Sequence, residues 1–337
     1  MLRVSCAFVP ETAMRRREFI SFIGSVAATW PLAARAQKQP ARIGFLGSGA
    51  ADTSAIFVEA LKLGLDENGL QEGRDYVLDL GWADGNYDRF PALAEKMVQN
   101  NATVILATTI SAVRSAQRAS NTIPIVMTSI NDPVGAGLIK SLSRPGGNTT
   151  GLANLAEDVS EKMLELTLAT LPNATKIAAL LNPANPANPV FFAKIVKLAG
   201  VGIGVYSVET RSSEQLDSAF AALGRDRPDA LLVLPDSTLI DAREKIAALA
   251  LRYRIPTITN APEYTDAGAL ISYGVSRLAR YRRCAYYVKR ILDGANPADL
   301  PVEQPTKIEL SINLKTAKKL AIPIPDTLVA RADRLIE

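Results

Sequence analysis

The segments ARIGFLG (residues 41–47) and SAIFVEALKLGLDENG (residues 54–69) decide the fold. The first is apolar almost throughout, as in a strand that is covered on both faces. One helical face of the second carries the apolar residues Ile56, Ala60, Leu61 and Leu65. Gly69 then ends the helix. A buried strand followed by such a helix is the repeating unit of a doubly wound α/β fold.

The same alternation runs along the chain in two series. The strand-like runs of the first series are residues 41–47, 76–82, 102–109, 123–130 and 148–155, and those of the second are residues 176–182, 204–210, 229–235 and 255–260. Apolar strands separated by helices form parallel sheets with helices on both faces. The sequence therefore predicts an α/β protein of two doubly wound parallel-sheet lobes.

The order of the elements predicts how the chain divides between the lobes. We assign residues 37–153 and 276–305 to lobe 1 and residues 154–275 to lobe 2. A late helix within GALISYGVSRLARYRRCAYYVKRIL (residues 268–292) would bring the chain back to lobe 1. Residues 306–337 read as one more strand and short helices, without a lobe assignment. More than one crossing makes a multi-strand hinge.

The segment MRRREFISFIGSVAATWPLAARAQ (residues 14–37) reads as an export signal. Three arginines precede an apolar run that is too short to span a bilayer, and Ala34-Arg35-Ala36 suits a signal peptidase. We therefore expect residues 1–36 to be a leader, with the true start at Met14. The pair Arg16-Arg17 matches the twin-arginine motif, which predicts export to the periplasm by that pathway.

Composition removes several functional classes. Residues 1–36 hold five of the 38 Lys and Arg and two of the 34 Asp and Glu, so 33 basic and 32 acidic residues remain. This balance gives no reason to expect a nucleic-acid partner. The chain has no histidine, which excludes His-based triads and His-containing zinc sites. Cys6 lies in the predicted leader, so Cys284 is the one cysteine of the remaining chain and is expected to be a packed helix residue. We expect no cofactor and no metal.

Polar residues follow many of the predicted strands, where open parallel sheets bind their ligands. The candidate ligand-binding residues are Ser48, Thr108, Thr109, Ser111, Asn131 and Asp132 in lobe 1, Asn182, Asp236, Ser237, Asn260 and Glu263 in lobe 2, and Tyr273 in the second crossing. Hydroxyls at a helix N-terminus suit a carboxylate. Pro133 should hold Asp132 extended, so that its carboxylate faces the cleft and accepts from an ammonium. Residues of these types also cap helices and form turns.

Several long blocks resemble one family. They are GFLGSG, WADGNYDRFPALAEKMV, NDPVGAGLIKSLSRPGGNTTG, SYG and LPVEQPTKIELSINLKTAKKLAIPIPDTLVARADRLIE, together with the leader. From Met14 to Glu337 the chain resembles ABC transporter substrate-binding proteins of the branch related to tryptophan and tyrosine binders. The resemblance implies a type I periplasmic binding fold whose lobes close on a small molecule and deliver it to a membrane permease. Ser276 and Arg277 stand where an acidic or amide residue often follows SYG, which argues against an aromatic amino acid ligand.

We therefore predict a periplasmic solute-binding component of an ABC importer, a monomer without enzymatic activity, that binds a small polar or amino-acid-like ligand. Two alternatives remain at this point. One is a periplasmic sensor that feeds a signalling receptor, because the same fold serves in receptors. The other is an α/β hydrolase that relies on carboxylates, although no paired acids stand out and the sequence has no Walker A motif or nucleophile elbow.

Overall fold

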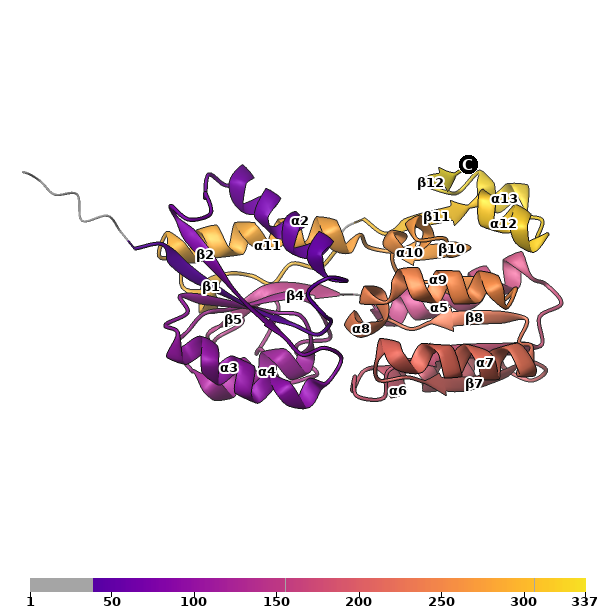
Figure 1. Cartoon of the computed structure of the whole chain (residues 1–337), viewed down its shortest axis with the longest axis horizontal. Helices are drawn as coiled ribbons and strands as arrows, with labels where there is room; N and C mark the ends of the chain where they lie inside the picture. The colour runs from indigo at the N-terminus through magenta and orange to yellow at the C-terminus, as the bar shows by residue number, and fades with distance from the viewer. Residues whose placement is uncertain (1–38, 155, 306) are drawn as a thin grey trace, which may run out of the picture. The chain divides into compact units, whose positions relative to one another are not determined.

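The structure, a computed structural model, describes residues 39–337 apart from residues 155 and 306. Pro40–Glu337 form one compact unit, with two sheets covered by helices (Figure 1). The predicted leader, the start at Met14 and the cleavage before Gln37 lie outside the described residues.

Lobe 1 is built on a five-stranded parallel sheet of order β2-β1-β3-β4-β5. Its strands are β1 (Ala41–Gly47), β2 (Tyr76–Trp82), β3 (Val104–Ala107), β4 (Ile125–Asn131) and β5 (Thr149–Asn154). Its helices are α2 (Ala55–Glu67), α3 (Phe90–Gln99), α4 (Ile110–Ala119), α11 (Arg277–Leu292), and the short η1 (Tyr87–Arg89) and η3 (Pro297–Asp299). The pair α2 and α11 covers one face of the sheet, and the pair α3 and α4 covers the other (Figure 1).

Lobe 2 is built on a seven-stranded sheet of order β12-β11-β10-β9-β8-β6-β7. Its strands are β6 (Lys176–Leu181), β7 (Gly204–Glu209), β8 (Ala230–Val233), β9 (Thr257–Thr259), β10 (Ile271–Gly274), β11 (Glu309–Asn313) and β12 (Arg334–Ile336). Its helices are α5 (Ala156–Thr170), α6 (Asn188–Ala199), η2 (Ser213–Gln215), α7 (Leu216–Asp226), α8 (Ser237–Asp241), α9 (Arg243–Arg252), α10 (Pro262–Asp266), α12 (Leu314–Leu320) and α13 (Asp326–Val329). All pairings are parallel except β10 with β11.

The two sheets share one topology. In lobe 1 the order is β2-β1-β3-β4-β5, and the first five strands of lobe 2 repeat it as β7-β6-β8-β9-β10. This is a doubly wound order, in which ligands bind outside the carboxyl ends of the strands, near the point where the strand order reverses. The predicted α/β architecture of two doubly wound lobes is confirmed.

The last segments of the chain connect the two sheets again. Helix α11 contacts α2, β4 and β5 of lobe 1, and residue Glu303 bridges to Leu152. The chain then enters the second sheet at β11, and β12 pairs with β11. Residues 309–313 and 334–336, which the sequence left unassigned, are therefore strands of lobe 2. The chain passes between the sheets after β5, after β10 and before β11, as a multi-strand hinge requires.

The buried face of α2 differs from the predicted one. Phe57, Leu61 and Leu65 are buried, but Ile56 is 40% exposed. Helix α2 packs against α11 on the side that carries Gly64. The helices are so close there that an added Cβ at Gly64 would come within 2.3 Å of the Arg282 carbonyl oxygen. Glycine has no apolar side chain, so the spacing of apolar residues does not reveal that Gly64 is on the buried face. The buried face predicted for α2 was therefore too close to Ile56.

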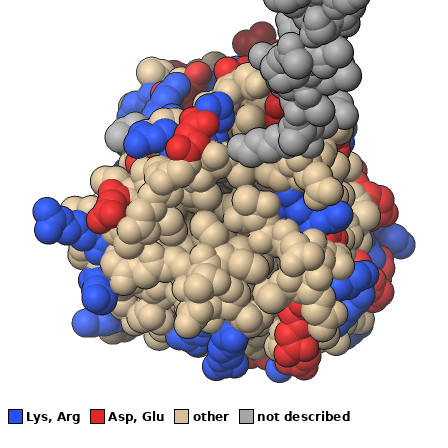
Figure 2. Space-filling model, turned by 90° about the vertical axis from the view of Figure 1, so that its left-hand side faces the viewer, with Lys and Arg blue, Asp and Glu red and all other residues tan. Residues whose placement is uncertain are grey.

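Among the helices of the described residues, none has the length and apolar character needed to cross a membrane. Figure 2 shows the end of lobe 1 that faces away from lobe 2, where Lys and Arg alternate with Asp and Glu around an uncharged centre.

Candidate functional site

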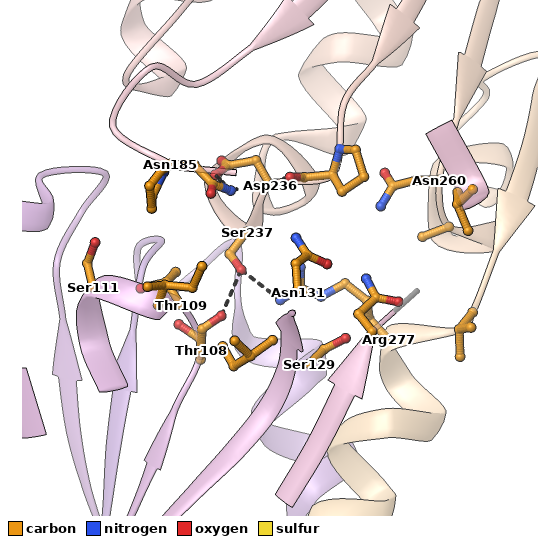
Figure 3. A pocket seen from close by; sticks show the side chains of 18 of the residues that line it. Thr108, Thr109, Ser111, Ser129, Asn131, Asn185, Asp236, Ser237, Asn260 and Arg277 are labelled. Atoms are coloured by element: carbon orange, nitrogen blue, oxygen red, sulfur yellow. Dashed lines mark hydrogen bonds between the residues drawn. The ribbon is translucent and has the colours of Figure 1, made fainter. Parts of the chain in front are cut away.

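A pocket lies where the carboxyl ends of strands from both sheets meet (Figure 3). Seven of the residues predicted from the sequence line it: Thr108, Thr109, Ser111, Asn131, Asp236, Ser237 and Asn260. They come from the ends of β3 and β4 in lobe 1 and of β8 and β9 in lobe 2. The structure therefore brings together residues up to 152 positions apart in the sequence.

The lobe 1 wall is formed by the start of α4. Thr109 caps this helix, because its Oγ1 accepts a hydrogen bond of 3.0 Å from the backbone N–H of Ala112. Thr108 Oγ1 donates to the carbonyl oxygen of Leu46 at 3.0 Å, so its proton is engaged in the fold. Ile110 and Ser111, the first two residues of α4, line the pocket. The first amides of a helix have no partner within the helix, so this wall carries free N–H groups and the positive end of the helix dipole.

The lobe 2 wall is organised by Asp236, which is buried at the end of β8 and caps α8. Its two oxygens accept from the backbone N–H of Thr238 (2.8 Å) and Leu239 (3.1 Å), the side-chain amides of Asn182 (3.3 Å) and Asn185 (3.0 Å), and the hydroxyl of Tyr87 (3.1 Å). A carboxylate offers about four lone-pair positions. The acceptor capacity of Asp236 is thus already used by the protein.

Tyr87 and Ser237 form hydrogen bonds that join the lobes at the pocket. Tyr87 of η1 in lobe 1 donates to Asp236 of lobe 2. Ser237 Oγ donates to the carbonyl oxygen of Thr108 at 3.2 Å and accepts from Nη2 of Arg277 at 3.1 Å (Figure 3). Ser237 therefore connects α8 of lobe 2 with both β3 and α11 of lobe 1.

Arg277 is the one cation among the residues that line the pocket. Its guanidinium lies 5.6 Å from the ring centroid of Phe57 and 5.8 Å from that of Tyr281. Burial lowers the pKa of Arg277, but Tyr281, Asp241 and Glu263 raise it more, and the net pKa lies above the usual value. The guanidinium is therefore charged.

Three buried polar atoms at the pocket have no hydrogen-bond partner among the described residues. They are Oδ1 of Asn131, Oδ1 of Asn260 and Nε of Arg277. Asn131 and Asn260 point into the space between the lobes in Figure 3. Buried polar groups are normally hydrogen-bonded, because an unsatisfied one costs free energy. These atoms are suited to contact a bound molecule.

Four other predicted residues lie outside the pocket lining. Ser48 is buried after β1 and accepts from the N–H of Gly85 through its carbonyl oxygen. Asn182 donates to Asp236 and so supports a lining residue. Glu263 accepts from Ser276 Oγ (2.8 Å) and the N–H of Leu278 (3.0 Å), at the start of α11. Tyr273 packs with the core of lobe 2 on β10.

The predicted geometry of Asp132 is wrong. Its φ of 35° is in the left-handed region rather than extended, and its side chain is exposed. Oδ1 accepts from the N–H of Gly135 at 2.8 Å, so the carboxylate folds back over its own turn. Pro133 restricts the preceding residue, but the hydrogen bond of this Asx-type turn outweighs that preference.

Sequence reasoning missed Tyr87, Ser129, Asn185 and Arg277 as lining residues. Asn185 is in NPANPANP, whose repeat reads as a stiff loop, and Tyr87 is five residues beyond the end of β2. Arg277 stood out only as a departure from the resembling family. Cys284 is buried as expected, with burial raising its pKa to about 12. In the part of the chain that the structure describes, no group of His, Cys, Asp and Glu could hold a metal ion.

The chain belongs to the ABC transporter substrate binding protein family, whose family model matches residues 50–336. A tyrosine-binding protein of Clostridioides difficile (strain R20291) is 26% identical over 257 residues, which are 76% of this chain and 74% of that protein. A conserved domain protein of Vibrio cholerae has a crystal structure with 31% identity and a TM-score of 0.78, covering 88% of this chain and 100% of that one. The resemblance predicted from sequence blocks is thereby confirmed.

Two further solved structures share the fold. The structure of a domain in complex with L-Trp from Streptococcus pneumonia gives a TM-score of 0.76 at 24% identity, covering 88% of this chain and all of that one. A ligand-free, open structure of a substrate binding protein from Clostridium difficile gives 0.59 at 22% identity, covering 88% of this chain and 99% of that one.

Proposed function

We propose that this protein is the periplasmic solute-binding component of an ABC importer, and that its two lobes close on a small polar ligand which it delivers to a membrane permease. The observation that carries the proposal is the pocket between strand ends of both lobes, with three buried polar atoms that lack a partner in the described part of the protein. Family membership supports it, because substrate-binding proteins of ABC transporters work outside the cytoplasm.

Binding without chemistry fits the residues of the pocket. Asp236 is the one carboxylate among the lining residues, and its oxygens already accept from protein donors. The chain contains no histidine, and the thiol of Cys284 is buried. A hydrolase would need a nucleophile beside a base. Two of the proteins named above, from Clostridioides difficile and Clostridium difficile, are described as binding proteins, which supports the same reading.

The importer role is tested with the permease and ATPase in proteoliposomes. We expect the protein, purified with its ligand, to stimulate ATP hydrolysis by that complex, and the ligand to enter the vesicles. The matched control is the same protein after its ligand has been removed by dialysis, which should stimulate less. Ligand binding without stimulation or uptake would contradict the importer role and favour a sensor.

A further inference from the structure

The wall of the pocket holds the positive charge of Arg277, which donates to the hydroxyls of Ser237 and Tyr281 but forms no ion pair with a carboxylate of the described residues. Asp241 and Glu263 raise its pKa without such a contact. The guanidinium rests on the rings of Phe57 and Tyr281, and one of its nitrogens, Nε, is buried without a partner. Burying a charge is costly unless it is paired and hydrogen-bonded. This cost favours a ligand that brings a negative charge to Arg277.

The opposite wall reinforces this preference. Ile110 and Ser111 begin the ten-residue helix α4 at the pocket, and the amides of a helix N-terminus favour an anion. Thr109 satisfies the N–H of Ala112, one turn further along, and leaves the first amides to the pocket. Positive potential thus comes from two independent elements, α11 and α4.

The pocket has no acidic acceptor to spare for an ammonium group. Asp236 accepts from Tyr87, Asn185 and further donors of the protein. The unpartnered acceptors are the neutral carbonyl oxygens of Asn131 and Asn260. Neutral carbonyls suit a hydroxyl or amide donor, whereas a desolvated ammonium requires a compensating negative charge.

We propose, on the basis of the proposed function, that the ligand is a small organic acid without an ammonium group. Its carboxylate binds Arg277, and its hydroxyl or amide hydrogen donates to Asn131 or Asn260. A single guanidinium matches one negative charge, so a monocarboxylate suits the site better than a phosphate dianion. The ligand class then differs from the L-Trp of the solved complex described above. Arg277 is the residue that sets this specificity.

The test uses probes that are too small to be excluded by the shape of the pocket. L-lactate carries a carboxylate and a hydroxyl, L-alanine replaces the hydroxyl by an ammonium, and L-lactamide replaces the carboxylate by a neutral amide. Binding of each to the dialysed mature protein is measured by ligand-observed NMR, with inorganic phosphate as a fourth probe. We expect lactate to bind at least about tenfold more tightly than the other three, since hydrogen bonds to charged groups differ from neutral ones by about that factor.

Variants assign the effect to Arg277. Arg277→Gln should weaken lactate binding by about ten- to a hundredfold, the range expected for a charged hydrogen bond. Arg277→Lys keeps the charge and should give an intermediate affinity. The matched control is Arg243→Gln, because Arg243 also lies over Phe57, at 5.5 Å, but does not line the pocket. Melting curves of all three variants verify that they are folded.

Several results would overturn the inference. They are an alanine or phosphate affinity equal to or above that of lactate, lactate binding that survives Arg277→Gln in a folded variant, and no lactate binding at the highest soluble concentration. A preference for alanine would leave the proposed function intact, because the site would still bind a solute. The proposed function is judged separately, by ATP hydrolysis and uptake with the ligand that accompanies the protein.

Discussion

The hydroxyl of Tyr87 in lobe 1 donates a 3.1 Å hydrogen bond to the carboxylate of Asp236 in lobe 2. Both residues are buried and line the pocket. Burial and the nearby Asp236 raise the pKa of Tyr87 well above its usual value, so the hydroxyl keeps its proton and remains a donor. Because this bond joins the two lobes, it should bias the hinge towards the closed arrangement.

Tyr87→Phe should shift the ligand-free protein towards open lobes. A hydrogen bond to a charged group contributes about 1.5–3 kcal/mol, so the ratio of closed to open protein should fall by about tenfold or more. Small-angle X-ray scattering would report a larger radius of gyration. Tyr286→Phe is the control, because the Tyr286 hydroxyl contacts Arg290 on the exposed side of α11. An unchanged radius of gyration in Tyr87→Phe would show that this bond does not govern closure.

Asp132→Ala and Asp236→Asn should differ in their effects on stability and on ligand affinity. Asp132 caps an exposed turn outside the pocket lining, so its removal should cost about 1 kcal/mol of stability or less and leave ligand affinity unchanged. Asp236→Asn weakens charged hydrogen bonds on the pocket wall and should reduce both the free energy of unfolding, by about 2 kcal/mol, and the affinity. Chemical denaturation and calorimetric titration with the accompanying ligand measure both quantities. A marked affinity loss in Asp132→Ala would restore its predicted binding role.

The stability of the protein should depend on pH through Asp241, the last residue of α8. Burial raises the pKa of this carboxyl from 3.8 to about 7, although Arg277 and Arg243 act to lower it. The folded protein therefore binds this proton more tightly than the unfolded chain does. Stability contributed by the protonated group is lost as pH rises from about 4 to about 7 and is constant above that range.

Asp241→Asn isolates this effect, because the amide stays neutral at every pH. The difference in melting temperature between Asp241→Asn and the unmodified protein should grow in favour of the variant between pH 4.5 and pH 7.5. Asp293→Asn is a suitable control, since Asp293 forms an ion pair with Lys289 on the surface. A difference that does not vary with pH would contradict the raised pKa.

Export should require both arginines of the pair Arg16-Arg17 in the predicted leader. Replacing Arg16 and Arg17 by lysine keeps the positive charge but removes the paired arginines that the export receptor reads. We expect the uncleaved protein to accumulate in the cytoplasm, as measured by cell fractionation and immunoblotting. The variant with Arg15→Lys alone should be exported and cleaved before Gln37. Normal periplasmic accumulation of the double variant would contradict the twin-arginine route but not a signal peptide.

The fold was predictable because the apolar strands and their order are local features of the sequence. Residues 41–47, 76–82 and 204–210 are strands within one residue of their predicted bounds. Strand ends define the pocket edge in any doubly wound sheet, which explains why Thr108, Asn131 and similar residues line it. Such predictions require no knowledge of contacts between distant parts of the chain.

The missed features depend on contacts between distant parts. Tyr87 reaches the pocket because η1 of lobe 1 meets Asp236, 149 residues further along the chain. Arg277 lines the pocket because the second crossing places the start of α11 beside Ser237. The prediction for Asp132 was wrong because of a local contact rather than a distant one. A turn hydrogen bond from the N–H of Gly135 fixes its carboxylate away from the pocket.

The central claim, that the pocket between the lobes holds a small solute, is tested most directly by native mass spectrometry of the protein purified from the periplasm of its own cells. The account predicts a complex with one bound small molecule, which denaturation releases, and loss of that molecule in a folded variant carrying Asn131→Ala and Asn260→Ala. A protein that emerges without any bound small molecule, or one whose bound molecule survives both substitutions, would contradict it.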